Sequence, residues 1–383
     1  MTPLHLAVAL DGAGWHPAAW REPDARPAEL FTAGYWVDLV AEAQRGLLDL
    51  VTFEDDLALQ STDRSADDGR TDQVRGRLDA VQVAARVAPV TEGIGLVPTA
   101  VVTHTEPFHL SKAIATLDYV STGRAGVRVK VSGSPSEAAH FGRREPGSLE
   151  DLFDEAGDWV EVVRRLWDSW EDDAEIRDVA TGRFVDRGKL HYIDFAGRFF
   201  SVKGPSITPR PPQGQPVVAA LAHQAIPYEL VARSTDLGFV TPTDAADAAR
   251  IVGEIRTAQA AAGRSEETVH VFGDVVVFLD DDAATARARR ARLDETAGAE
   301  YRSDALVFDG TPAELSDLLT AWAEAGLTGF RLRPAALPHD LRQITSGLVP
   351  ELQRRGLFRT AYEADTLRGL LGLPRPANRY ATV

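Results

Sequence analysis

The stretch GIGLVPTAVVTHTEPFHLSKAIATLDYVSTGRAGVRVKV at residues 93–131 contains one complete strand–helix–strand unit. Residues 93–98 form a short apolar run that predicts a buried strand. Residues 107–120 predict a helix with one apolar face, because large apolar residues recur there at intervals of three or four. A turn separates this helix from a second strand at residues 125–131. Two strands joined through a helix are expected to lie parallel in one sheet.

The same alternation continues in both directions along the chain. Further strands are predicted at residues 4–10, 50–53, 216–221, 238–240, 269–279 and 329–332. Further helices are predicted at residues 35–48, 78–87, 149–170 and 225–233, from Thr243 onward, after Asp280–Asp282, from the capping box at Thr311 to Ala325, and at 341–354. Eight strands alternating with helices predict an α/β fold, a (β/α)8 TIM barrel. A doubly wound open sheet is less favoured, because no Gly-x-Gly-x-x-Gly follows the first strand.

The chain is expected to form one barrel domain over residues 1–358, followed by a C-terminal tail at 359–383. A polar stretch at 171–215 is too long for an ordinary connection, so it is predicted to be an insertion after the fourth strand–helix unit that covers one end of the barrel. Within it, residues 189–193 and 198–202 predict a small hairpin around Phe195-Ala196-Gly197.

Composition restricts the chemistry of the protein. The 383 residues include no cysteine, which excludes disulfides and thiol catalysis. The formal net charge of −16 argues against broad binding to nucleic acid or to anionic membranes. No long apolar stretch and no signal-peptide pattern is present, so a cytoplasmic protein is expected. The histidines are scattered without ligand spacing, and no metal site is expected.

The predicted strand at 125–131 carries an unusual set of polar residues. Arg128, Lys130 and Ser132 alternate, so their side chains share one face of the strand. Two cations that point into a barrel require an anion. The residues leave three candidates open: a phosphate, a carboxylate of the substrate, or a buried Asp or Glu.

Several long motifs resemble those of the bacterial luciferase-like flavin monooxygenases. They are DLVTFED at 49–55, GLVPTAVVTHTEPFH at 95–109 and ATLDYVSTGRAG at 115–126. The motifs RLWDSWEDDA at 165–174, GRFFSVKGP at 197–205 and PPQGQP at 211–216 are similar to the subgroup of nitrilotriacetate monooxygenase, dibenzothiophene-sulfone monooxygenase and pristinamycin IIA synthase. The likeness extends in order from residue 4 to residue 357.

The resemblance implies a flavin-dependent enzyme, and it indicates which residues of this chain would bind the flavin. In such an enzyme, reduced FMN from a separate flavin reductase reacts with oxygen and oxidises a small organic substrate. The flavin is expected at the carboxyl ends of the strands, close to Asp55, Thr103 and Ser132. The insertion at 171–215 is expected to shape the substrate pocket. No catalytic residue is assigned.

Two positions depart from the family pattern at the flavin phosphate. The chain has Asp151-Leu152-Phe153 where the family often carries an Arg-Tyr pair, and ALAHQAIPY at 220–228 where it usually carries Gln-Ala-Gly-Ser-Ser. His223, Gln224 and the N-terminus of the following helix are therefore expected to hold the phosphate, with help from Arg128 or Lys130.

Two alternatives to an FMN monooxygenase follow from these departures. One is a barrel that has lost flavin chemistry and serves as a binding protein, and the other is an F420-dependent oxidoreductase of the same superfamily. A homodimer is also expected, on family likeness and on Trp159, Trp167 and Trp170, whose helical spacing predicts either core packing or a subunit interface.

Overall fold

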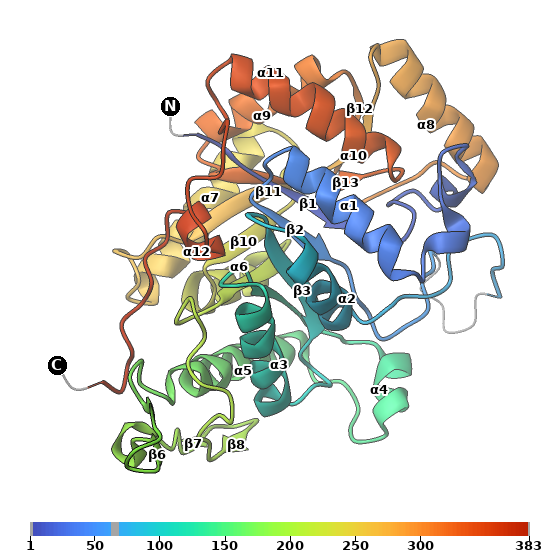
Figure 1. The fold of residues 1–383 in the computed structure, drawn as a ribbon. Helices are drawn as coiled ribbons and strands as arrows, with labels where there is room; N and C mark the ends of the chain where they lie inside the picture. The colour runs from blue at the N-terminus through green and yellow to red at the C-terminus, as the bar shows by residue number, and fades with distance from the viewer. Residues whose placement is uncertain (1–2, 63–68, 382–383) are drawn as a thin grey trace.

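The computed structural model describes residues 3–62 and 69–381, and its centre is a closed parallel barrel (Figure 1). The eight barrel strands are β1 (His5–Leu10), β2 (Leu50–Phe53), β3 (Gly95–Val101), β4 (Gly126–Lys130), β9 (Val217–Ala222), β10 (Leu237–Val240), β11 (His270–Leu279) and β13 (Gly329–Pro334). Pairing between β10 and β11 closes the ring, and every barrel pairing is parallel. The predicted TIM barrel is confirmed.

The helices surround the barrel. They are α1 (Ala33–Arg45), α2 (Ala80–Val87), α3 (Pro107–Val120), α5 (Leu149–Asp168), α6 (Ala225–Ser234), α7 (Ala245–Ala261), α8 (Ala283–Ala297) and α9 (Pro312–Glu324). Side chains of Asp244, Asp282 and Thr311 cap α7, α8 and α9, because each accepts a hydrogen bond from a backbone N–H of the first turn. Within the described ranges, no helix combines the length and the apolarity needed to cross a membrane.

The predicted closing helix at 341–354 is divided into three parts. They are α10 (His339–Gln343), a π-helical turn (Ile344–Leu348) and α11 (Val349–Arg354). The π turn occurs where Val349 donates its N–H five residues back, to Ile344. The next residue is Pro350, which has no N–H to restore the ordinary pattern.

Two further elements lie outside the prediction. The short strand β12 (Leu306–Gly310) pairs with residues 275–279 of β11, outside the barrel ring. It was missed because only three of its residues are large and apolar. The helix α4 (Pro135–Phe141) follows β4 and is capped by Ser134.

The insertion contains two small hairpins. The first pairs β5 (Glu175–Asp178) with β6 (Arg183–Val185), and the second pairs β7 (Phe195–Ala196) with β8 (Ser201–Val202). The predicted strands at 189–193 and 198–202 were therefore misplaced: Phe195 belongs to a strand, and the turn comes after it. The reason is packing, since Phe195, Phe200 and Val202 lie against apolar residues of α5.

The insertion does not form a lid over the carboxyl ends of the strands. It begins after α5 and ends before β9, both at the amino-terminal end of the barrel. There Gln213 donates hydrogen bonds to Asp118 and to the carbonyl of Ala125, just before β4. The second hairpin extends along the outside of α5, where Arg198 pairs with Asp151 at 2.6 Å. The segment before β9 thus helps to cover the amino-terminal end, and the second hairpin extends along α5 as far as the first turn of that helix.

The expected C-terminal tail packs against the barrel. Residues 359–381 cross the amino-terminal end, where α12 (Leu367–Leu370) lies beside the strands, to their left in Figure 1. Leu367, Leu371 and Leu373 share one buried cluster with barrel residues such as Leu50 and Phe272. The cluster forms the layer of the core at the amino-terminal end of the barrel.

His270 connects β11 to this C-terminal segment. Its Nε2 lies 2.8 Å from the carbonyl oxygen of Leu371, and its Nδ1 lies 3.1 Å from Oγ1 of Thr328. Burial, with a smaller effect from the neighbouring His5, lowers the pKa of His270 to about 4. The folded protein therefore holds this imidazole neutral.

Acid is expected to destabilise the protein through His270. Because the folded pKa lies below the unfolded value of about 6.5, the stabilisation is complete above pH ~6.5 and is lost as the pH falls toward 4. We expect the melting temperature to fall between pH 7 and pH 5, and to fall less in a His270→Gln variant, which does not titrate. Differential scanning calorimetry of both proteins at the two pH values measures this, and equal falls would show that His270 does not contribute.

Candidate functional site at the barrel mouth

Six of the seven residues expected at the cofactor site lie at the carboxyl ends of the strands, called here the mouth, and the seventh, Arg128, lies further down β4. The seven residues are Asp55 after β2, Thr103 after β3, Arg128, Lys130 and Ser132 on and after β4, and His223 and Gln224 after β9. Two pairs among them are in contact. Lys130 donates to the carbonyl of Asp55 at 3.2 Å, and the N–H of Ser132 donates to Oγ1 of Thr103 at 2.9 Å.

Asp55 anchors a helix at the mouth. Its carboxylate accepts hydrogen bonds from the N–H of Ala80, at the start of α2, and from the N–H of Asp56. Burial raises the pKa of Asp55, and these two bonds oppose that rise. The contacts correspond to a helix-capping role in the described structure.

Arg128 lies inside the barrel, below the mouth, and is only 2% exposed. It forms an ion pair with Glu54, and its Nε donates to Oγ1 of Thr99 at 3.0 Å. Burial lowers the pKa of the Arg128 guanidinium to about 10, while the Glu54 charge opposes this. Of the three anions that the sequence left open, the structure supplies a buried carboxylate.

Glu54 belongs to a continuous buried network. Arg331 on β13 bonds to Glu54 at 3.1 Å and to Asp274 on β11 at 2.9 Å. Arg333 also binds Asp274, and it continues to Asp304 at 2.7 Å. Burial alone would raise the pKa of Glu54, but the adjacent arginines hold it at about 2. With Arg128, three cations thus meet three carboxylates, and the network is neutral.

Lys130 has its own carboxylate partner. Its Nζ lies 2.6 Å from Oδ2 of Asp56, and the two side chains are 30% and 27% exposed. Burial would raise the pKa of Asp56, but Lys130 and nearby groups lower it. The ammonium of Lys130 therefore already faces an opposite charge at the mouth.

The segment after β9 presents an open helix N-terminus. Gln224 is the N-cap of α6, and its side chain makes no capping hydrogen bond. The first turn leaves the N–H groups of Ala225 and Ile226 without intrahelical partners, and Pro227 has none to offer. Both Gln224 and Ala225 are exposed. A helix N-terminus of this kind attracts anions.

His223 stands beside this N-terminus and connects it to the buried network. Its Nδ1 lies 2.9 Å from Oγ1 of Thr241, and its Nε2 lies 3.4 Å from Oδ2 of Asp304. Burial lowers the pKa of His223, although the Asp304 carboxylate opposes this. The imidazole therefore offers a hydrogen bond rather than a positive charge near neutral pH.

Two buried polar atoms at the mouth lack hydrogen-bond partners among the described residues. They are Nε2 of His104, after β3, and Oε2 of Glu137, on α4. The His104 ring stacks on Phe141 of the same helix, with centroids 4.8 Å apart. Burial raises the pKa of Glu137 and lowers that of His104. Each of these two atoms thus has an unused hydrogen bond with which it can bind a polar ligand.

The β1 and β2 side of the mouth is nearly closed. A pocket bordered by Asp11, Trp36, Glu54 and Arg77 has a volume of only about 10 Å³. Arg77 pairs with Asp11 at 2.8 Å across it. This pocket therefore leaves no room for a large ligand.

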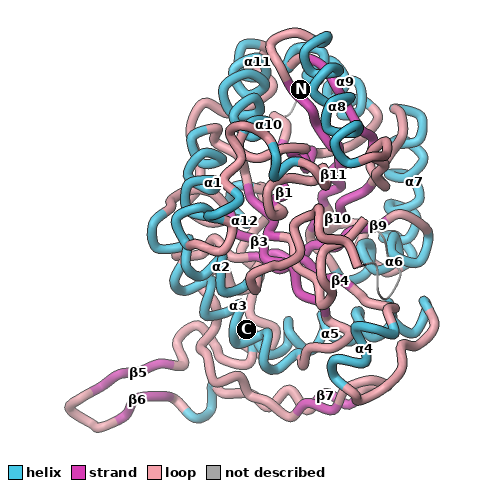
Figure 2. Tube along the Cα trace, turned by 90° about the vertical axis from the view of Figure 1, so that its right-hand side faces the viewer, coloured by secondary structure: helices cyan, strands magenta, loops and turns pink. Residues whose placement is uncertain are grey.

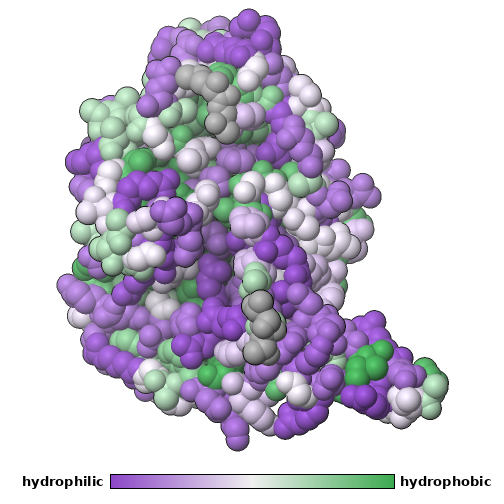
Figure 3. Space-filling view, turned by 90° about the vertical axis from the view of Figure 1, so that its left-hand side faces the viewer, coloured by the Kyte–Doolittle hydropathy of each residue, from purple (hydrophilic) through white to green (hydrophobic). Residues whose placement is uncertain are grey.

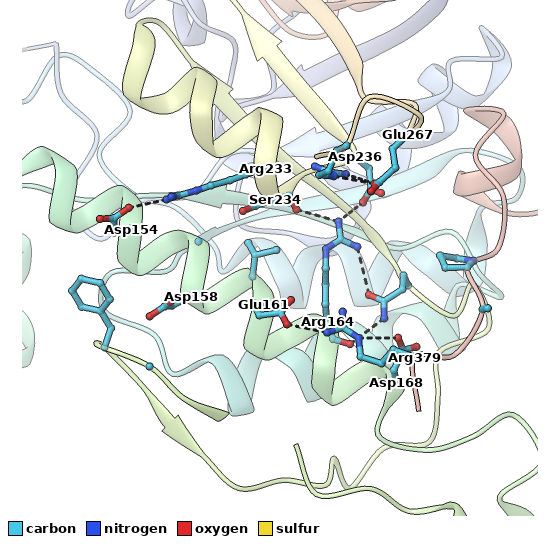
Figure 4. A pocket seen from close by; sticks show the side chains of 18 of the residues that line it. Asp154, Asp158, Glu161, Arg164, Asp168, Arg233, Ser234, Asp236, Glu267 and Arg379 are labelled. Atoms are coloured by element: carbon cyan, nitrogen blue, oxygen red, sulfur yellow. Dashed lines mark hydrogen bonds and ion pairs between the residues drawn. The ribbon is translucent and has the colours of Figure 1, made fainter. Parts of the chain in front are cut away.

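A wide groove lies outside the barrel, between α5, α6 and the C-terminal segment (Figure 4). It encloses about 910 Å³. Its charged side chains bind one another, as the pairs Arg164–Asp236, Arg233–Asp154 and Arg379–Glu161 show at 2.8, 3.0 and 2.9 Å. These pairs leave few of the groove's charges free for a ligand, and the mouth remains the candidate site.

Sequence reasoning overlooked Glu54, Asp274, Arg331 and Arg333. A signal was present, because FRLR at 330–333 alternates in the same way as VRVK at 127–130, and Asp274 interrupts an apolar strand. Glu137 carried no comparable signal. The position of Glu137 depends on α4, which was not predicted.

Comparison with known proteins places the chain among oxidoreductases. The family model of luciferase-like monooxygenases matches residues 15–326. The chain is 31% identical to nitrilotriacetate monooxygenase component A of Aminobacter aminovorans, over 99% of this chain and 98% of that protein. It is 30% identical to N-acetyl-S-(2-succino)cysteine monooxygenase of Bacillus subtilis (strain 168), with the same coverage.

Solved structures agree on the fold. The crystal structure of a long-chain alkane monooxygenase superposes with a TM-score of 0.89 at 23% identity, over 97% of this chain and 96% of that one. A riboflavin lyase, solved with modified FMN and riboflavin, gives a TM-score of 0.86 at 25% identity, with equal coverage. From the family match and the full-length relatives, we conclude that the chain belongs to the luciferase-like monooxygenase family.

Proposed function

We propose that the protein is the oxygenase component of a two-component monooxygenase that uses reduced FMN. A separate flavin reductase supplies the reduced flavin, and the substrate is a small organic molecule. The relative named component A, and the relatives named subunits A and B of pristinamycin IIA synthase, support a system of several proteins. When bound, the flavin supplies the activation of oxygen.

The observation that carries this proposal is the uncapped N-terminus of α6 at the mouth. The backbone N–H groups of Ala225 and Ile226, together with Gln224 and His223, offer donors for the phosphate of FMN. The site fits in part, since the segment contains neither serine nor glycine. Affinity for the phosphate is therefore expected to depend on the helix N-terminus.

The remaining predicted residues fit two different roles. Thr103 and Ser132, joined by a hydrogen bond, fit contacts to the flavin ring at the end of β3 and β4. Arg128 and Lys130 lie one step further from the flavin than Thr103 and Ser132. They hold the carboxylates of Glu54 and Asp56 in place. Asp55 fixes the start of α2.

The unpartnered atoms next to Thr103 and Ser132 support a ligand on this side. His104 follows Thr103 directly, and Glu137 lies on the helix after Ser132. Together they would bind polar atoms of the ring or of the substrate and keep water from the reacting atoms. The fully paired network of buried arginines and carboxylates beneath the mouth supports these groups rigidly.

Replacing Gln224 with aspartate is expected to discriminate between FMN and riboflavin. The new carboxylate can accept the N–H of Ile226 and repels a phosphate, so the anion site is lost while α6 gains a cap. A charge-assisted contact contributes about 1.5–3 kcal/mol, so we expect the Kd of FMN to rise about tenfold to a hundredfold. Riboflavin, which has no phosphate, should bind as before. Fluorescence titration with oxidised flavins and anaerobic titration with reduced ones measure both constants.

The matched control is Gln224→Asn, which has the size of aspartate without its charge. This variant should bind FMN within a few fold of the natural protein. Equal weakening of FMN and riboflavin in the aspartate variant would mean that position 224 supports the pocket instead of the phosphate. Failure of the natural protein to bind either flavin, oxidised or reduced, would refute the proposed cofactor.

A further inference from the structure

The amino-terminal end of the barrel is closed, so a substrate has to approach from the mouth. A buried layer closes that end, where Leu367 and Leu371 pack against barrel residues such as Leu50. Outside this layer, the surface on that side carries mainly hydrophilic side chains (Figure 3). The mouth faces the viewer in Figure 2, with the strands inside the ring of helices and α4 at the lower right. The charges at the mouth are therefore the ones that a substrate meets.

Six cations at the mouth or just beneath it are paired with carboxylates. The pairs are Arg77–Asp11, Arg128–Glu54, Lys130–Asp56, Arg144–Glu155, Arg331–Asp274 and Arg333–Asp304. Asp55 and Glu137 add two further carboxyl groups, and burial raises the pKa of both. With six cations against eight carboxyl groups, this set has no positive excess, whether or not the last two hold a proton. An anionic substrate is not attracted to such a site.

Among the cations on the barrel strands, Lys130 is the one that a substrate can reach. Its side chain is 30% exposed, whereas the side chains of the three arginines in the buried network are at most 3% exposed. The ammonium lies 2.6 Å from Oδ2 of Asp56 and donates to the carbonyl of Asp55 at 3.2 Å. Asp56 thus neutralises the accessible cation.

The backbone holds Asp56 in this position. Its Oδ1 accepts a hydrogen bond from the N–H of Leu57 at 3.0 Å. Its own N–H donates to Asp55 at 2.8 Å, and Asp55 in turn binds the start of α2. A carboxylate of a substrate would therefore have to displace a fixed carboxylate before it could bind Lys130.

The two unpartnered atoms at the mouth fit an uncharged polar group. Oε2 of Glu137 and Nε2 of His104 each have an unused hydrogen bond. Both groups lie along α4, because the His104 ring stacks on Phe141, which is one helical turn after Glu137. An amide or a hydroxyl both donates and accepts hydrogen bonds, so it can satisfy either atom without bringing a charge.

We propose that the substrate is an uncharged, polar organic molecule, and that Asp56 excludes carboxylates from the site by occupying Lys130. The inference rests on the proposed monooxygenase function, because it names the class of substrate for the same site. It separates this chain from the relative named nitrilotriacetate monooxygenase component A, since nitrilotriacetate carries three carboxylates. Each carboxylate that leaves water needs a partner, and here the reachable partner is already taken.

Asp56→Asn tests the exclusion directly, because it removes the charge of the side chain and leaves Lys130 in place. Nitrilotriacetate is the probe, and isothermal titration calorimetry measures its Kd. We expect the variant to bind it about tenfold to a hundredfold more tightly than the natural protein does, as a new charge-assisted contact implies. The neutral triamide, nitrilotriacetamide, should bind the natural protein more tightly than nitrilotriacetate does, and the substitution should change its Kd by no more than a few fold.

Two controls show whether the freed ammonium causes the gain. Asp56→Asn combined with Lys130→Gln should lose it. Glu106→Gln frees Arg143, whose exposed pair with Glu106 lies at 2.9 Å, and it should leave the Kd of nitrilotriacetate unchanged. Circular dichroism checks the fold, and Asp56→Ser replaces Asp56→Asn if the latter does not fold.

Three results would overturn the inference. They are tighter binding of nitrilotriacetate than of the triamide by the natural protein, no gain in the Asp56 variant, and an equal gain in Glu106→Gln. If the natural protein binds neither probe, the Asp56 variant decides by its gain or lack of gain. Titration of the same proteins with FMN separates the two proposals: flavin binding without a gain overturns only the substrate class, whereas absence of flavin binding refutes the cofactor and leaves the role of Asp56 to the nitrilotriacetate result.

Discussion

Replacing Asp274 with alanine is expected to destabilise the protein by about 3–5 kcal/mol, because two buried arginines lose their shared partner. Asp274 is fully buried, as is Arg331, and Arg333 is 1% exposed. Without the carboxylate, these guanidinium groups remain in the barrel with an unmatched charge. The loss is a large fraction of the stability of an ordinary domain. Denaturant unfolding followed by circular dichroism gives the change in unfolding free energy.

Two controls separate the buried network from ion pairs in general. Asp274→Asn keeps the shape and part of the hydrogen bonding, and it should lie between the natural protein and the alanine variant. Arg250→Ala removes an exposed pair with Asp247 on α7, and it should cost about 0–1 kcal/mol. Equal costs for Asp274→Ala and Arg250→Ala would show that the network contributes no more than a surface pair.

The network also changes the expectation for Arg128. If Arg128 were a free cation on β4, Arg128→Ala would weaken the binding of FMN more than that of riboflavin. Since Arg128 is paired with Glu54 inside the barrel, we expect its loss to lower stability and to affect both flavins alike. The anion-binding role then remains with the N-terminus of α6.

The barrel could be predicted because each strand carries its own signal. Residues 50–53 and 107–120 match the predicted bounds without change, since apolar periodicity is a local property. The prediction of the hairpin in the insertion failed for the opposite reason: its strand bounds depend on a tertiary contact. Whether Phe195 belongs to a turn or a strand is decided by its contact with α5, which no local pattern contains.

In the candidate site, too, some features could be predicted from the sequence and others could not. The positions of Thr103, Ser132 and His223 follow from the ends of β3, β4 and β9, and these could be predicted. The partner of Arg128 could not, because Glu54 and Asp56 look alike in sequence, and only the closed ring brings Glu54 to Arg128. The closure of the barrel, and not the local sequence, thus decides which of the neighbouring carboxylates pairs with Arg128.

Replacing Leu367 with alanine is expected to cost about 2–5 kcal/mol, although it lies in a segment that the sequence suggests is only a tail. Leu367 is 0% exposed and fills the amino-terminal end of the barrel beneath Leu50 and Val97. The same segment brings Arg359 to Asp49 at 2.5 Å. Removing residues 359–383 should therefore prevent the barrel from folding.

The control for this experiment is Glu363→Ala, an exposed substitution in the same segment that should change the unfolding free energy by less than about 0.5 kcal/mol. Thermal and urea unfolding of the natural protein, the two variants and the truncated chain compare these effects. If the truncated chain melted at the temperature of the natural protein, the segment would be dispensable, and the barrel core would end at residue 358. If instead Leu367→Ala and the truncation both destabilise the protein, the last residues close the amino-terminal end of the barrel. The strands can then hold the charged network further toward the mouth, because water does not reach it from the amino-terminal end.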